Sequence, residues 1–163
     1  MNAFDDIPFE LLPEVDALAA LKNTDTEVAI LSILISHPAV FDDISDKLKP
    51  AFFSGDLNRI LFTELVRQIA SGEPFDVVTL ADAMQGKATI QEIHAIAQSH
   101  DFSARGIGRM VQILSDRYKS MQLHGLSQKM AVLAFETTPV QGRIDSAMAE
   151  LSKLDDAEDA DEW

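Results

Sequence analysis

Gly86 and Lys87 are the residues of this sequence that come closest to a nucleotide site, because phosphate-binding loops place a lysine directly after a glycine. Such a loop also needs a glycine five residues earlier and a hydroxyl residue after the lysine, where they help to hold phosphate and Mg²⁺. Here those two positions are Ala81 and Ala88. The pair is therefore not a phosphate loop, and we predict no nucleotide or other cofactor.

Acidic residues gather at Asp42, Asp43 and Asp46, where several carboxylates could bind a metal ion. No ligand-rich loop accompanies them, so we favour a solvated helix face. The histidines show no metal-ligand spacing; they are His37, His94, His100 and His124. The sequence contains no cysteine, and no nucleophile stands beside a base. We therefore predict no metal site, no catalytic residue and no enzymatic activity.

Length and composition describe one globular domain, with 163 residues of which 47% are hydrophobic. No apolar run approaches the roughly 18 residues needed to span a bilayer, and the N-terminus lacks a basic signal-peptide start. The lack of cysteine suits a reducing compartment. We expect a cytoplasmic protein without membrane contact.

The net charge of −14 is concentrated at the two ends of the chain. The first 23 residues carry −4 and the last nine carry −6, which leaves −4 for residues 24–154. An acidic chain repels phosphate, so direct nucleic-acid binding is expected to be weak or indirect. Proteins with basic surfaces are the expected partners.

Hydrophobic periodicity predicts a globular helical head over residues 23–102. Its first helix is expected to begin with a capping box formed by Thr24 and Glu27. The residues that follow are apolar on nearly every face of a helix, and such a helix is buried on nearly every face. We therefore place it at the centre of the head.

A second amphipathic helix is expected over residues 56–70 of the head, ended by Gly72. Asp76 is placed to cap the next helix, since its carboxylate can accept from the free backbone amides. Thr89 and Glu92 give another capping box and open a further helix.

Residues 103–154 predict a helical hairpin, whose first arm runs to Phe135 and would span about 50 Å at roughly 1.5 Å per residue. This arm has more apolar length than the second arm can cover, which favours pairing with a second chain. The alternative, that the two stripes satisfy each other within the hairpin, is equally supported. The residues expected to form a self-association or partner-binding surface are Ile107, Met110, Val111, Leu114, Tyr118, Met121, Leu123, Leu126, Met130, Leu133, Ile144, Met148 and Leu151.

The first arm of the hairpin also has a basic side. Its cations are Arg105, Arg109, Arg117, Lys119 and Lys129. An alternative function is therefore a nucleic-acid-binding helical module that uses this side of the 103–135 helix. No aromatic stacking row accompanies the cations, so we favour a salt-bridged face.

Two acidic segments flank these elements: a proline-containing arm over residues 1–22 and a tail over residues 155–163, which we expect to be disordered. Within the arm, a possible docking motif consists of Asp5, Asp6, Ile7, Pro8 and Phe9. It resembles the acidic tip with which single-stranded-DNA-binding proteins recruit replication partners, although packing of the arm on the core is the favoured interpretation. Trp163 could anchor the tail in a basic groove of a partner, although a solubilising end is the favoured interpretation.

An ordered set of motifs runs through the head. Its residues are Leu48, Lys49, Pro50, Phe53, Arg59, Phe62, Gly72, Pro74, Asp76, Thr79 and Leu80, preceded by Glu27, Leu31, Leu34, Pro38, Phe41 and Asp42. In types and spacing this set resembles the N-terminal domain of DnaB-type replicative DNA helicases. The resemblance covers residues 24–84 well and continues loosely to Leu154. Asn58 departs from the pattern, because the family usually has histidine there.

The resemblance implies an all-α fold, in which a small globular multi-helix head is followed by a long helical hairpin. In these helicases the ATP site lies in a separate C-terminal motor. The resemblance therefore implies a non-catalytic DNA-replication protein that acts by self-association and by binding replicative DNA helicase, primase or both. It could be a helicase accessory, a loader, an inhibitor or the excised domain of a full helicase.

Overall fold

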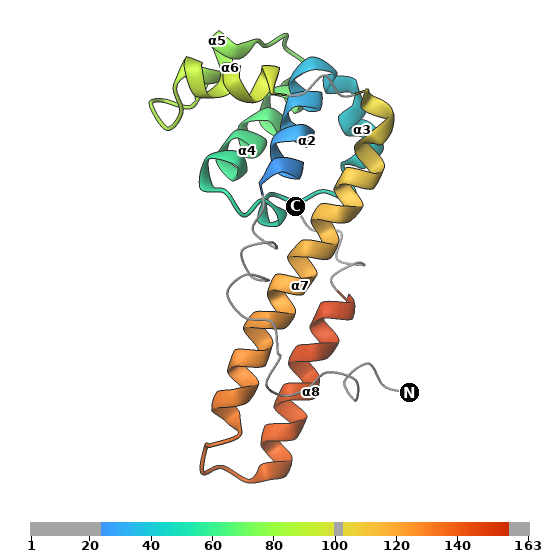
Figure 1. The fold of residues 1–163 in the computed structure, drawn as a ribbon, viewed down its shortest axis with the longest axis vertical. Helices are drawn as coiled ribbons and strands as arrows, with labels where there is room; N and C mark the ends of the chain where they lie inside the picture. Colours follow the sequence, from blue (N-terminus) through green and yellow to red (C-terminus); the bar gives the residue numbers. More distant parts are fainter. Residues whose placement is uncertain (1–23, 100–102, 157–163) are drawn as a thin grey trace.

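A computed structural model describes residues 24–99 and 103–156, and every regular element within these ranges is helical. A head of short helices lies at one end of a hairpin made of two long helices (Figure 1). The elements of the head are α2 (Asp25–Ser36), η2 (Pro38–Val40), α3 (Phe41–Ile44), η3 (Pro50–Phe52), α4 (Asp56–Ser71), α5 (Val77–Ala83) and α6 (Ile90–Gln98). The hairpin follows as η4 (Ala104–Gly106), α7 (Ile107–Leu133) and α8 (Val140–Asp156). The predicted all-α head and hairpin are confirmed.

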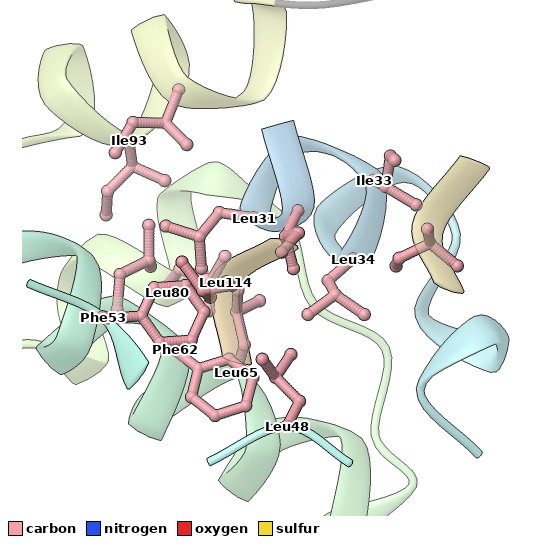
Figure 2. Packing of buried hydrophobic residues seen from close by; sticks show 14 of the residues in the cluster. Leu31, Ile33, Leu34, Leu48, Phe53, Phe62, Leu65, Leu80, Ile93 and Leu114 are labelled. Carbon is pink, nitrogen blue, oxygen red and sulfur yellow. The ribbon is translucent and has the colours of Figure 1, made fainter. Parts of the chain in front are cut away.

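Helix α2 lies at the centre of the head, as its sequence predicted, and packs against α4, α6 and α7. Ile30, Leu31 and Leu34 are fully buried, because neighbouring helices cover almost every face of α2. The hydroxyl of Ser32 donates to the carbonyl of Ala97 at 2.9 Å, which ties α2 to α6. Figure 2 shows Leu31 and Leu34 among the other labelled residues of the core.

Aromatic rings fill the space between α4 and the segment that precedes it. Phe53 and Phe62 are fully buried and stack with their ring centroids 4.6 Å apart (Figure 2). Phe41 meets the same Phe62 ring edge-on at 6.3 Å. Offset and edge-to-face contacts of this kind are favourable, so these rings fix η3 and α3 against α4.

The ends of α4, α5 and α6 follow the local signals in the sequence. Helix α4 ends at Gly72, whose φ of +73° is a left-handed conformation that glycine adopts without strain. The amide of Thr79 donates to the carboxylate of Asp76 at 2.9 Å. This hydrogen bond is the main reason that the pKa of Asp76 is lowered. The capping box of Thr89 and Glu92 is also confirmed.

The capping box expected at the start of α2 was wrong. Thr24 is the N-cap residue, but its side chain makes no capping hydrogen bond. The Glu27 carboxylate, with only 1% of the residue exposed, turns instead toward the loop before α4. It accepts hydrogen bonds from the Ser54 hydroxyl at 2.6 Å, the Gly55 amide at 3.1 Å and the Asn58 amide group at 3.3 Å. These distant partners stabilise a buried carboxylate better than one local amide does.

Candidate protein-association surface

Helices α7 and α8 pack side by side as an antiparallel hairpin (Figure 1). Helix α7 has 27 residues, which gives a length of about 40 Å at 1.5 Å per residue. The Arg143 guanidinium of α8 donates through Nη1 to the carbonyls of Leu133 and Ala134, both at 2.9 Å. These carbonyls belong to the last turn of α7, where helices leave carbonyl groups without intrahelical partners. Arg143 therefore ties the end of α7 to the first turns of α8.

The first half of α7 belongs to the head. Ile107, Val111 and Leu114 are at most 5% exposed and lie in the same hydrophobic cluster as α2 and α4 (Figure 2 labels Leu114). The prediction that placed these three residues on an association surface must be corrected, because the head already covers them. The core thus continues across the expected boundary at residue 103.

The second half of α7 and most of α8 extend beyond the head. Of the predicted residues in this part, Leu126 is buried, while Met121 and Leu133 are partly buried. Met110 and Tyr118, nearer the head, are also partly buried. The predicted residues that the structure leaves exposed are Leu123, Met130, Ile144, Met148 and Leu151.

Three further apolar residues near the turn were not in the predicted set. Val132, Phe135 and Val140 are all more than half exposed, and Phe135 reaches 89%. Val132 lies in the last turn of α7, and Phe135 follows the end of that helix at Leu133. At about 3.6 residues per turn, Val132 lies about five turns after Leu114 and on the same side of α7, so the predicted stripe could have been extended to it.

One cation on the basic side of α7 contacts the head. Arg117 donates from Nη1 to the Thr26 hydroxyl at 3.2 Å, a contact that links α7 to α2. Arg105 and Arg109 are exposed near the beginning of α7, and Lys129 is exposed near its far end. The five cations therefore do not form one phosphate-binding row with equal access to solvent.

The exposed side of the hairpin can contact another protein, but it holds few groups that could bind a metal ion or catalyse a reaction. Within residues 24–99 and 103–156, no three His, Cys, Asp or Glu side chains come together as metal ligands. Glu150 accepts from Lys153 at 2.9 Å, and this hydrogen bond is the main reason that the pKa of Glu150 is lowered. No helix in the part of the chain that the structure describes is long and apolar enough to cross a bilayer.

Two predicted docking motifs lie outside the described residues. They are the segment from Asp5 to Phe9 and the aromatic residue Trp163. Of the tail expected from residue 155, the first two positions belong to α8, which runs to Asp156. The rest of the tail lies beyond the described part of the chain.

The described residues form an all-α domain whose projecting hairpin carries exposed apolar side chains. Residues 19–116 match the model of the DnaB-like helicase N-terminal domain, which is more than half of the chain. The chain therefore belongs to the DnaB-like helicase N-terminal domain family.

Two relatives show how far the likeness extends. The chain is 25% identical over 120 residues to a replicative DNA helicase DnaB from Pasteurella multocida; the match covers 71% of this chain but 26% of that protein. The crystal structure of the N-terminal domain of DnaB helicase from Mycobacterium tuberculosis has a similar fold, with a TM-score of 0.71 at 16% identity. That similarity covers 80% of this chain and 96% of the other. The chain thus spans about a quarter of the length of the curated relative.

Proposed function

We propose that this chain is a non-catalytic DNA-replication protein that acts through the exposed apolar surface of its hairpin. In this proposal the hairpin pairs with a second copy of the chain or with the corresponding hairpin of a replicative DNA helicase, and the assembly binds primase. Membership of a helicase N-terminal domain family and the name of the Pasteurella relative support a role in replication. The proposal applies equally to a free-standing protein and to one segment of a longer helicase, because the surface is the same.

The proposal rests mainly on where the exposed apolar side chains lie. Among the described residues, eleven large hydrophobic side chains are exposed, and eight of them lie between residues 123 and 151. These eight define the hairpin surface: Leu123, Met130, Val132, Phe135, Val140, Ile144, Met148 and Leu151. Scattered exposed apolar side chains are ordinary, but their concentration on one projecting element marks an interaction site.

The spacing on α8 shows how a partner helix would fit. Val140, Ile144, Met148 and Leu151 follow one another at steps of four, four and three residues, which places them along one stripe of the helix. Their exposed fractions lie between 47% and 63%. Such a stripe matches the apolar stripe of a second helix packed alongside it.

Sedimentation of single-residue variants tests the proposal. We expect the parent protein to self-associate and Met148→Asp to weaken this association at least tenfold, because a carboxylate in an apolar interface loses its hydration. The matched control is Val78→Asp, which introduces the same charge at a valine that is 58% exposed on the head. Val78→Asp should associate like the parent.

A pull-down with purified DnaB-type helicase and primase extends the test to other partners. We expect the parent and Val78→Asp to be captured and Met148→Asp to be lost. High salt should leave the capture largely intact, because apolar pairing is screened little, whereas binding through phosphate contacts falls steeply with salt. A parent that stays monomeric and is captured by neither protein would overturn the proposal.

A further inference from the structure

A groove beside the first half of α7 is not used by the proposed function. It has a volume of about 800 Å³ and lies between the segment of η2, α3 and η3 and the first half of α7. Ile44, Ile107 and Val111 contribute to its wall, so its inner part is apolar. Its size falls within the range of about 300–1,000 Å³ that is usual for ligand pockets.

The charge of the groove is opposite to that of the chain. Its lining includes four cationic residues, Lys47, Lys49, Arg105 and Lys119, against two carboxylates, Asp43 and Asp46. The chain as a whole has a net charge of −14. A basic lining in so acidic a protein favours an acidic occupant, and the low dielectric of a groove strengthens the attraction.

The groove also holds an aromatic pair. The rings of Phe52 and Tyr118 lie with their centroids 4.8 Å apart, and both residues line the groove. A further aromatic ring can pack against such a pair, and a buried tryptophan is among the strongest anchors at protein interfaces. The chemistry of the groove thus fits an acidic peptide that carries an aromatic residue.

The same chain carries such a peptide. Residues 157–163 contain four carboxylates and Trp163. Leu154, near the end of α8, is itself a lining residue of the groove, and residue 157 follows it by three positions in the sequence. Seven residues can extend over about 24 Å. We propose that the segment 157–163 docks in this groove of its own chain, with its carboxylates facing the cations and the Trp163 ring against Phe52 and Tyr118.

The sequence supplies its own spectroscopic probe, since Tyr118 and Trp163 are its single tyrosine and single tryptophan. Docking should give energy transfer from Tyr118 to Trp163 in the full chain. It should also shift the emission of Trp163 to the blue of that of a peptide of residues 155–163. Both signals should be independent of protein concentration, and 1 M salt should reduce them, because screening then acts within about 3 Å.

A pair of charge reversals tests the contact itself. We expect Lys47→Glu combined with Arg105→Glu to reduce the energy transfer at least threefold, since both side chains are exposed at the groove. The control combines Lys87→Glu with Lys129→Glu, which changes the net charge equally at exposed lysines outside the groove. This control should behave like the parent, and the circular dichroism of all variants should match.

Three results would overturn the proposal. Transfer that rises with protein concentration would place the segment in the groove of a second copy. An equal loss of energy transfer in the charge-reversal pair and in its control would show that only the net charge of the protein matters. A Trp163 emission identical to that of the free peptide would show that the ring does not dock. If the charge-reversal pair fails to fold, the salt titration of the parent decides instead.

Discussion

The two halves of α7 both carry apolar residues at helical spacing, but the second half is much less covered than the first. In the first half, Ile107, Val111 and Leu114 are buried in the core of the head. In the second half, Leu123 and Met130 are 52% and 43% exposed. The difference arises because, among the described elements, α2 and η3 pack against α7 within the head, whereas α8 packs against the part of α7 beyond the head (Figure 1). An apolar stripe therefore specifies that a face will be covered, but the neighbours determine whether the cover comes from the same chain.

The largest expected change in stability comes from placing an aspartate in the core of the head, and the comparison is an aspartate placed on the exposed hairpin. Leu114→Asp should destabilise the head by about 4 kcal/mol, because it buries an unpaired carboxylate in the core. Met148→Asp, at a side chain that is 63% exposed, should change the stability by no more than about 0.5 kcal/mol. Urea unfolding followed by circular dichroism measures both values. Similar losses in the two variants would erase the distinction between core and association surface.

An intermediate effect is expected at Glu27, which joins α2 to the loop before α4. Glu27→Ala should cost about 2 kcal/mol, because it leaves the partly buried Gly55 amide and the buried Asn58 side chain without their acceptor. Glu27→Gln keeps one carbonyl acceptor and should lose less. These variants separate the head from the hairpin, since the association constant of the hairpin should be unchanged in both. Unfolding curves and sedimentation at a temperature where each variant is folded provide the two measurements.

The smallest effect concerns acid sensitivity at Asp76 of the head. Because the pKa of Asp76 is lowered in the folded chain by its hydrogen bond from the Thr79 amide, its ionised form stabilises the head. That contribution is fully present above the usual aspartate pKa of about 3.9 and is lost as the pH falls through the lower, folded value. Asp76→Asn should remove this part of the pH dependence while an amide oxygen still caps α5. Stability measured between pH 6 and 2 would show equal slopes for variant and parent if the cap plays no such part.

Local signals in the sequence predicted the head well. The helix expected over residues 56–70 is α4, Asp56–Ser71, and the caps at Asp76 and Thr89 form as expected. Each of these features depends on residues within one or two helical turns, so the sequence alone contains its cause. The hairpin was predictable for the same reason, since its arms are long amphipathic runs joined at Pro139.

Features that depend on distant residues were not predictable. Glu27 had the right spacing for a capping box with Thr24, but its partners lie 27 to 31 residues further along the chain. Periodicity alone did not separate Leu114 in the core from Met130 on the surface. The groove beside α7 is built from segments around residues 43–52, 104–122 and 154, which only the folded chain brings together.

The contact of Arg143 with the end of α7 has a mechanical consequence. Since Nη1 holds the last carbonyls of α7, the two arms are joined firmly at their turn. Helix α7 is also continuous from the core of the head to that turn. The hairpin would therefore move as one unit about the point where α7 leaves the head, near Tyr118. From there α7 runs on for about 22 Å at about 1.5 Å per residue, so a tilt of about 10° would move the tip by about 4 Å, and small shifts among the head helices would displace the surface proposed to bind partners.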